Sequence, residues 1–284
     1  MTMDLEQNIL KTLDKWEERK SSLPESLAFY RSLLSIQSRV KARLRTPVSL
    51  PDIKIARERT ISGRPLLAFN DITIDASLLK DTFTEIISFL SIYSETSSGA
   101  VPNPAFADLF APETTKAWFE GKPLPDFKET GDNDGAFREL ILGAVYHPFL
   151  VSYQEAWHHL VNQELWRRSY CPVCGGHPDL AFLDKERGSR WLLCSRCDAR
   201  WLYQRLECPW CHTQDQNALA YLGSEKGIYR VYTCERCRCY LKAIDLRQTE
   251  EEILLPLERY LTLDLDIQAQ KNGYRPVFGI KEGG

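Results

Sequence analysis

The chain has 284 residues, of which 43% are hydrophobic and 26% are charged, and its formal net charge at pH 7 is −3. This length suffices for one large domain or two smaller ones, and the composition is ordinary for a globular protein. A net charge so close to zero excludes a global electrostatic attraction to nucleic acid or to an anionic membrane surface.

The sequence gives no sign of export or of membrane insertion. Its N-terminus, MTMDLEQNILKTLDKW, lacks the basic segment and the apolar segment that together make a secretory signal. No run of 18 apolar residues occurs, so no membrane-spanning helix is expected. We therefore expect a cytoplasmic protein with no membrane partner.

The first 167 residues are predicted to form an all-helical domain. Apolar residues recur at helical spacing and predict helices over 5–16, 22–44, 76–94, 104–111, 113–120, 136–146 and 149–167. His147-Pro148 is expected to separate the last two, because proline disfavours a helix interior. Stretches rich in proline and glycine predict irregular connections over 46–74 and 121–135, with a break at Ser97-Ser98-Gly99.

This helical region carries no catalytic signature. It contains no phosphate-binding glycine loop, no dinucleotide fingerprint and no nucleophile elbow. His158 and His159 are adjacent, so on a helix their side chains diverge by about 100° and cannot share one ligand site. We expect a protein that is not an enzyme and has no catalytic residues.

The most informative stretch begins after this region, because all nine cysteines lie between residues 171 and 239. Two thiolates separated by two residues can turn both sulfurs onto one cation, and two such pairs complete a tetrahedral site for zinc or iron. In a chain without an export signal, paired C-x-x-C motifs indicate metal ions rather than disulfides. The candidate metal ligands are the eight cysteines in four such pairs: Cys171/Cys174, Cys194/Cys197, Cys208/Cys211 and Cys234/Cys237.

An internal repeat predicts how these pairs combine. Cys171-Pro-Val-Cys174 matches Cys208-Pro-Trp-Cys211, and the segment from Arg190 to Cys197 matches that from Arg230 to Cys237. Each copy therefore predicts a cysteine knuckle, a strand, a turn at a glycine, a returning strand and a second knuckle, as in rubredoxin or a zinc ribbon. We expect the pairs to combine in sequence order into two four-cysteine sites, and a cross-braced arrangement is the alternative.

Residues beside the cysteine pairs allow a structural and a functional interpretation. Cys239 could be a packed thiol or a transient replacement ligand, and His212 could be an exposed knuckle residue or a replacement ligand. Arg196 and Arg236 lie inside their pairs and are expected to offset excess thiolate charge. The tryptophans of this region are expected to fill the ribbon cores, and an exposed one would mark a partner surface: Trp191, Trp201 and Trp210.

Apolar residues from Pro256 to Leu265 predict one short C-terminal helix that ends at Asn272-Gly273, a favourable C-cap pair. The sequence thus predicts an α+β protein. An all-helical domain (1–167) precedes two tandem rubredoxin-like or zinc-ribbon modules (168–206 and 207–245) and a C-terminal helix with its tail (246–284).

The cysteine block resembles the FdhE family of formate dehydrogenase accessory proteins. The likeness includes the tandem knuckles, Arg190-Trp191-Leu192-Leu193-Cys194, the segment from Trp201 to Arg205 and Tyr240-Leu241-Lys242. Leu261-Thr262-Leu263-Asp264 and Asn272-Gly273-Tyr274 extend it downstream, whereas Cys239 and His212 depart from the family pattern. The resemblance implies an assembly factor that binds the immature catalytic subunit of a formate dehydrogenase.

Two other classes of function remain open from the residues alone. A nucleic-acid-binding ribbon is disfavoured by charge: residues 171–245 hold eleven Lys/Arg and nine Asp/Glu, a balance of +2. Two divalent ions, each with four thiolates, would add −2 apiece and bring that balance to −2. A thiol oxidoreductase would need a single reactive C-x-x-C pair, whereas four pairs at ligand spacing favour metal ions.

Overall fold

The structure is a computed structural model that describes residues 5–44, 51–96, 106–125, 134–223 and 227–277. The chain divides into two compact units. The first consists of Met1–Ser49, Ala68–Tyr153 and Lys281–Gly284, and the second of Leu50–Leu67 and Gln154–Ile280. Within the described residues no helix is long and apolar enough to cross a membrane.

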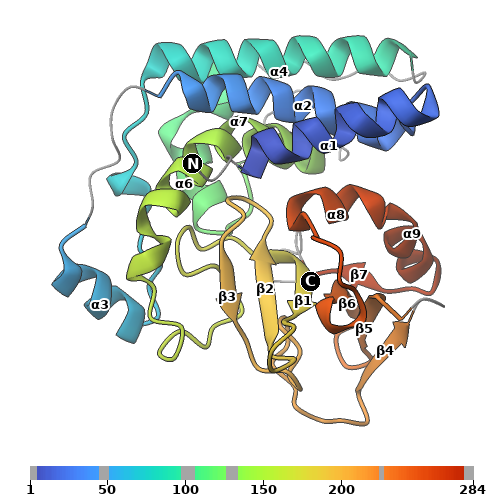
Figure 1. Cartoon of the computed structure of the whole chain (residues 1–284). Coiled ribbons are helices and arrows are strands. Elements are labelled where there is room, and N and C mark those ends of the chain that lie inside the picture. Colours follow the sequence, from blue (N-terminus) through green and yellow to red (C-terminus); the bar gives the residue numbers. More distant parts are fainter. Residues whose placement is uncertain (1–4, 45–50, 97–105, 126–133, 224–226, 278–284) are drawn as a thin grey trace. The chain divides into compact units, whose positions relative to one another are not determined.

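The described part of the first unit is helical. Its helices are α1 (Leu5–Lys20), α2 (Glu25–Ala42), α4 (Ala76–Thr96), α5 (Phe106–Leu109), α6 (Pro112–Phe119) and α7 (Asp134–Trp157), with a short 3-10 turn η1 at Phe69–Asp71. Helices α1, α2 and α4 lie side by side (Figure 1). They bury the apolar positions that the helical spacing singles out, among them Leu13, Leu34 and Ile86, so the predicted helical region is confirmed.

Helix α7 differs from the prediction, because Pro148 lies inside one helix rather than between two. Proline has no N–H for the carbonyl of Ala144, four residues earlier. Gln37 of α2 supplies the missing donor, since its Nε2 lies 2.9 Å from the Ala144 oxygen. The flanking side chains, including Phe149 and Leu150, are buried, and their burial offsets the roughly 3 kcal/mol cost of an internal proline.

The same helix also ends ten residues before the predicted end at 167. A 3-10 turn, η2 (His158–Leu160), follows Trp157, and the side chain of Asn162 then accepts hydrogen bonds from the backbone of Glu164 and Leu165. Such local bonds compete with helix formation. The chain that leads into the first cysteine pair is therefore irregular.

A second difference concerns the predicted irregular connection over 46–74. Its described part contains helix α3 (Ile53–Ile61), whose Asp52 cap accepts a hydrogen bond from the Lys54 backbone. Residues 50–67 belong to the second unit. There the backbones of Leu66 and Leu67 donate to the carbonyls of Pro172 and Val173, both at 2.8 Å, so this segment supports the first knuckle.

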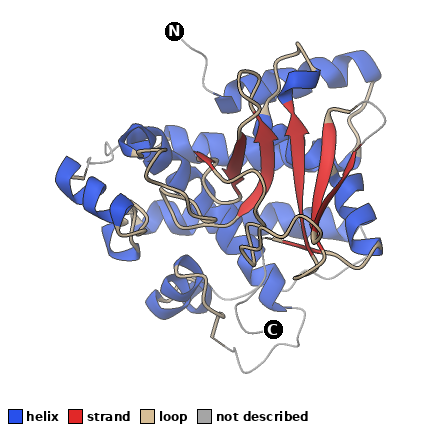
Figure 2. Ribbon diagram, turned by 90° about the horizontal axis from the view of Figure 1, so that it is seen from below, coloured by secondary structure: helices blue, strands red, loops and turns tan. Residues whose placement is uncertain are grey.

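The second unit contains one mixed sheet built from both repeats (Figure 2). Its strands are β1 (Pro178–Leu183), β2 (Arg190–Cys194), β3 (Arg200–Leu202), β4 (Leu219–Gly223), β5 (Tyr229–Cys234), β6 (Cys239–Asp245) and β7 (Arg275–Pro276). The order is β3-β2-β1-β6-β5-β4, and β7 pairs with β6. Each repeat contributes three antiparallel strands, and the parallel pairing of β1 with β6 joins them.

The predicted hairpins are confirmed. Gly188 and Gly227 have φ angles of +63° and +70°, values that favour glycine, and they lie in the turns between the returning strands. The joining of the repeats into one sheet is not apparent from the repeat itself. Whether each repeat folds as a separate module remains a prediction.

The single predicted C-terminal helix is two helices, α8 (Leu255–Leu261) and α9 (Leu263–Lys271), which follow a 3-10 turn η3 (Leu246–Gln248). They are separated at Thr262 (φ −118°, ψ 25°), whose hydroxyl donates to the Glu258 carbonyl. The ammonium of Lys242 contacts the carbonyls of Arg259 and Thr262 at 2.9 and 3.4 Å. A cation at the carboxyl end of α8 satisfies carbonyls that lack a helical partner, which stabilises the break.

Helix α9 covers one face of β5 and β6, where Ala269 packs against Val231 and Tyr240. It ends as predicted at Asn272 and Gly273, and Gly273 has a φ of +79°. The architecture is therefore α+β, with a helical N-terminal region, a mixed sheet and C-terminal helices. The predicted break at 97–99 and residues 126–133 of the predicted polar loop lie outside the described residues.

Candidate metal centres

All four cysteine pairs adopt the same backbone turn. The residue after the second cysteine of each pair is left-handed, with φ between +56° and +76°: Gly175, Asp198, His212 and Arg238. Its N–H donates to the carbonyl of the first cysteine of the pair, at distances from 2.9 to 3.3 Å. The turn directs both sulfurs to one side. It also explains why His212 occupies the place of a glycine, since histidine is among the residues that adopt this conformation more readily.

The eight sulfurs form two groups, in the sequence order that the repeat predicts. Within each group the ligand atoms lie within 4.8 Å of one another. In the first group, Cys171 Sγ lies 3.6 Å from Cys197 Sγ and Cys174 Sγ 3.5 Å from Cys194 Sγ. In the second group the two closest Sγ–Sγ distances are both 3.6 Å, between Cys208 and Cys237 and between Cys211 and Cys234.

These separations fit a metal ion and exclude disulfides. A disulfide brings its sulfurs to about 2.05 Å, and all nine cysteines are free thiols. Zn–S bonds of about 2.3 Å in a tetrahedron place neighbouring sulfurs about 3.8 Å apart. Each group is therefore a four-cysteine cluster able to bind a metal ion. Four thiolates suit zinc and iron equally well and leave no open coordination position.

Backbone N–H groups point at the sulfurs of the first cluster. Cys171 Sγ accepts from the N–H groups of Val173 and Cys174 at 3.3 and 3.4 Å, and Cys194 Sγ accepts from Arg196 at 3.4 Å. A similar contact joins the Trp210 N–H to Cys208 Sγ at 3.5 Å. Such donors stabilise thiolate charge and orient the ligand.

The two clusters differ in exposure. All four cysteines of the first are buried, whereas Cys211 and Cys237 of the second are half-buried. Burial raises the pKa of the Cys171 thiol well above its ordinary value and that of Cys208 to about 12. Hydrogen bonds, first from Cys171, hold the pKa of Cys174 well below its ordinary value. Without a cation, four clustered thiols cannot all ionise, so metal binding would release protons.

A buried charge network supports the second knuckle of the first cluster. Arg259 of α8 donates to the carbonyl of Cys194 and to the carboxylate of Asp198, each at 2.5 Å, and forms an ion pair with Asp179 at the same distance. Burial opposes a charge here, but Asp179 and Asp198 keep the pKa of Arg259 well above its ordinary value. Sequence reasoning missed this network, because its members lie more than 60 residues from Arg259 and share no local pattern.

The residues that flank the cysteine pairs follow the sequence-based expectations only in part. Arg196 lies against Gly176 and its charge contributes to the lowered pKa of Cys174, as expected, whereas Arg236 is exposed. A Cβ at Gly176 would come within 3.0 Å of Cys194 Sγ, so glycine is required by this close approach. Trp201 is fully buried, and Trp191 and Trp210 are half-buried.

Cys239 and His212 lie beside the second cluster but outside it. Cys239 is 2% exposed, and its Sγ lies 3.6 Å from the Cys237 carbonyl, which favours the packed-thiol interpretation. His212 has a side chain that is 58% exposed, with Nδ1 3.4 Å from a Glu207 carboxylate oxygen and 3.3 Å from the Tyr203 hydroxyl. The structure thus gives His212 a partner other than a metal ion.

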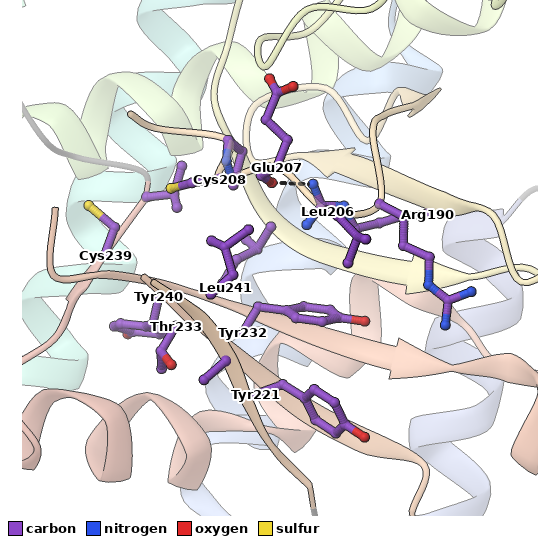
Figure 3. A pocket seen from close by; sticks show the side chains of 15 residues that line it. Arg190, Leu206, Glu207, Cys208, Tyr221, Tyr232, Thr233, Cys239, Tyr240 and Leu241 are labelled. Atoms are coloured by element: carbon purple, nitrogen blue, oxygen red, sulfur yellow. Dashed lines mark hydrogen bonds between the residues drawn. The ribbon is translucent and has the colours of Figure 1, made fainter. Parts of the chain in front are cut away.

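A cavity with a volume of about 100 Å³ lies next to the second cluster (Figure 3). Its walls come from β4, β5 and β6 and from the connection between the two repeats. The labelled side chains include Tyr221 and Tyr232 on one wall, Leu206 on another and the sulfurs of Cys208 and Cys239 at one end. No sequence pattern indicates this cavity, since its residues come from both repeats.

Comparison with known proteins shows what this site resembles. The family model described as "FdhE, central domain" matches residues 170–205, which contain the first cluster. The chain is 33% identical over 156 residues to the protein FdhE homolog of Aquifex aeolicus, a match that covers 53% of each protein. A match to the protein FdhE homolog of Pseudomonas aeruginosa is 32% identical over 152 residues and covers 47% of this chain and 48% of the relative.

The chain is similar to FdhE proteins. Its matches span about half the length of the curated relatives. The crystal structure of the FdhE protein from Pseudomonas aeruginosa superposes with a TM-score of 0.60 over 99% of this chain and 95% of that one. At 22% sequence identity, this likeness shows that the two proteins share a fold. The FdhE resemblance expected from the cysteine block is confirmed.

Proposed function

We propose that this FdhE homolog is a non-enzymatic, cytoplasmic accessory protein that binds the immature catalytic subunit of a formate dehydrogenase during its maturation. Similarity to FdhE proteins carries the proposal. Two closed four-cysteine clusters support it, because a site with four thiolates offers no coordination position to a substrate.

We further propose that each cluster holds one iron or zinc ion. Cys171, Cys174, Cys194 and Cys197 would bind the first ion, and the second would be bound by Cys208, Cys211, Cys234 and Cys237. Structural zinc ions contribute roughly 10–16 kcal/mol of apparent binding free energy to small folds. The fully buried first cluster suits a structural ion, whereas the half-buried second cluster also suits an ion that senses redox state.

The decisive experiment is anaerobic co-purification of this protein with the host's formate dehydrogenase catalytic subunit, with metal analysis of the same sample. A complex that carries about two metal ions per chain is expected. If the protein retains its metal ions but no complex forms, the formate dehydrogenase proposal is wrong while the metal assignment stands. A ratio of 260 to 280 nm absorbance typical of protein alone would dismiss the nucleic-acid alternative.

A further inference from the structure

The C-terminal segment 255–276 lies outside both repeats and contacts both. It consists of α8, α9 and β7, and the two helices contact each other beside the sheet (Figure 1). Helix α8 packs on the first repeat, where Leu255 joins a buried cluster with Leu193 of β2. Helix α9 packs on the second, where Ala269 lies against Val231 of β5. This segment therefore bridges the two halves of the sheet.

The segment meets the two metal centres at equivalent positions. In each repeat the second cysteine pair is followed by a left-handed residue, Asp198 in the first (φ +58°) and Arg238 in the second (φ +56°). Each of these residues closes a turn by donating its N–H to the carbonyl of the first cysteine of its pair, at 3.3 Å in the first centre and 2.9 Å in the second. The geometry of this turn decides where two of the four sulfurs point.

In the first centre, Arg259 of α8 holds both ends of this turn. Its guanidinium donates to the carboxylate of Asp198 and to the carbonyl of Cys194, each at 2.5 Å. The side chains of Arg259 and Asp198 are 15% and 13% exposed, so water competes little for these contacts. The planar fork of an arginine suits a contact at two points, which the single ammonium group of a lysine does not reproduce. Arg259 thus fixes the turn from a helix that is 61 residues away from Asp198 in the sequence.

In the second centre, the chain that follows α9 holds the corresponding turn. The Arg238 guanidinium donates to the carbonyl of Asn272 at 3.0 Å, and its central carbon lies 4.2 Å from the centre of the Tyr274 ring. The N–H of Arg275 donates to the Arg238 carbonyl at 2.8 Å, and the Tyr274 hydroxyl donates to Glu235, inside the last cysteine pair. The Arg238 side chain is 47% exposed, so its contacts contribute less free energy than those of Arg259.

The first knuckle of each centre has its support elsewhere in the chain. In the first centre, Leu66 donates its N–H to the carbonyl of Pro172, and Pro65 lies against Gly175. In the second centre, the ring of His212 contacts a Glu207 carboxylate oxygen at 3.4 Å. The contacts of segment 255–276 with Asp198 and Arg238 therefore serve a separate purpose, because they hold the second knuckle in both centres.

We propose that segment 255–276 completes both metal centres, with Arg259 as the positioning residue of the first and Arg238 as that of the second. The proposal rests on the metal binding proposed above and adds residues outside the ligand set. A turn that is already held in its ligating geometry loses less conformational freedom when an ion binds, so the ion is held more tightly and is released more slowly. Groups that orient metal ligands typically change metal affinity by about 10–100-fold.

A role for Arg259 as a counterion alone predicts a different pattern. Asp179 of β1 also forms an ion pair with Arg259, at 2.5 Å, and its side chain is 14% exposed, close to the value for Asp198. Asp179 lies on a strand, whereas Asp198 belongs to the turn. If charge neutralisation alone mattered, the two carboxylates would be interchangeable. Positioning of the turn makes the loss of Asp198 the more harmful one for metal binding.

Asparagine substitutions at three positions form a matched set. Asp179→Asn and Asp198→Asn each remove one carboxylate charge next to Arg259 and leave it the other, so neither leaves a buried charge without a partner. Asp198→Asn and Arg238→Asn change equivalent positions, and asparagine adopts the left-handed conformation more readily than most residues, which preserves both turns. Arg259→Lys keeps the charge and loses the contact at two points, so it tests the first centre from the other partner.

The test follows metal release from the full-length protein loaded with cadmium-113, a soft divalent ion that thiolates bind. The wild type is expected to show two cadmium resonances, and Cys194→Ser assigns the first centre by removing one of them. After an excess of EDTA is added, Asp198→Asn and Arg259→Lys should each release the first ion at least about tenfold faster and the second at the wild-type rate. Arg238→Asn should accelerate release of the second ion alone, by about two- to fivefold, because its contacts are exposed. Asp179→Asn should change either rate far less than Asp198→Asn changes the first.

Near-UV circular dichroism of the loaded proteins checks that each variant is folded. Faster release of both ions from Asp198→Asn would reveal a general loosening of the fold and overturn the proposal. Equal effects of Asp179→Asn and Asp198→Asn would assign Arg259 to charge neutralisation and overturn it as well. A wild-type protein that binds no cadmium would refute the metal sites and this proposal with them. Two bound ions whose release no variant alters would refute the positioning role and leave the metal sites intact.

Discussion

The role of each cysteine follows from its place relative to a left-handed knuckle residue. Eight thiols are brought into the two clusters by the turns that end at Gly175, Asp198, His212 and Arg238. The ninth, Cys239, is the first residue of β6 and lies outside both clusters. A thiol at this position contributes packing rather than a metal bond.

Serine substitution should therefore distinguish Cys239 from the eight cysteines of the clusters by its effect on metal content. Cys171→Ser should lose one metal ion per chain and unfold the first repeat. Metal binding at a complete site of four thiolates supplies folding free energy, and three thiolates would not supply it. Cys239→Ser should retain both ions. Metal analysis of the two purified variants checks this, and normal metal content in Cys171→Ser would refute the ligand assignment.

Asp245 connects the end of β6 to two arginines. Its side chain is fully buried and pairs with Arg230 and with Arg247, whose Nε lies 2.7 Å from the carboxylate. Hydrogen bonds from Arg247 hold its pKa below the ordinary value of 3.8. Because the folded-state pKa is depressed, this carboxylate stabilises the fold fully above its unfolded pKa, and the contribution is lost as the pH falls through the folded pKa.

Replacing Asp245 by asparagine should cost about 1.5–3 kcal/mol at neutral pH, since it removes the charge-assisted hydrogen bonds of a buried carboxylate to the half-buried Arg230 and the exposed Arg247. The difference in unfolding free energy between wild type and variant should stay constant down to about pH 5 and shrink below about pH 4. Urea unfolding at a series of pH values measures this difference. Acid affects the metal sites of both proteins alike, so a difference that grows on acidification would contradict the assignment.

At the scale of single elements, α7 is helical through Pro148 because another helix completes its hydrogen bonding. The donor comes from Gln37 of α2, which is 4% exposed and bonds to the Ala144 carbonyl. Sequence analysis places a break at this proline because the missing N–H is visible in the sequence, whereas its replacement lies 107 residues away. A local rule was outweighed by a tertiary contact.

A double-mutant cycle tests this compensation. Gln37→Leu should destabilise the first unit by about 1–3 kcal/mol, the usual cost of a buried carbonyl without a donor. Pro148→Ala supplies an N–H to the same carbonyl, so the double variant should recover most of that loss. Chemical unfolding of the four proteins provides the comparison. Strictly additive effects would show that the two residues do not serve the same carbonyl.

At the scale of the whole molecule, local patterns predict what lies within one repeat, and long-range pairing decides the rest. The helical region, the four knuckles, the hairpins and the sequential clusters all follow from spacing and from the repeat. Three features do not follow from such local patterns. The two repeats share one sheet, Leu66 and Leu67 support the first knuckle, and Arg259 lies between Asp179 and Asp198. These contacts join segments whose sequences contain no mutual signal.

The shared sheet predicts that the two repeats depend on each other. Separating residues 168–206 from 207–277 would uncover the paired edges of β1 and β6, which match Leu180 with Lys242 through Leu183 with Asp245. It would also leave Arg259 without Asp179 and Asp198. Exposed edges and unpaired buried charges both favour aggregation or unfolding.

We therefore expect the fragment 168–277 to be more stable than either half when all three are loaded with metal. Each half can still gather four thiols, so metal content alone does not distinguish the outcomes. The measurement is the denaturant midpoint of each metal-loaded fragment, together with its state of association. If both halves are monomeric and unfold at the midpoint of 168–277, the repeats are independent modules, as the sequence alone suggests. A lower midpoint or aggregation of the halves, with the intact fragment unfolding in one transition, would make the β1–β6 pairing the contact that unites the two metal centres.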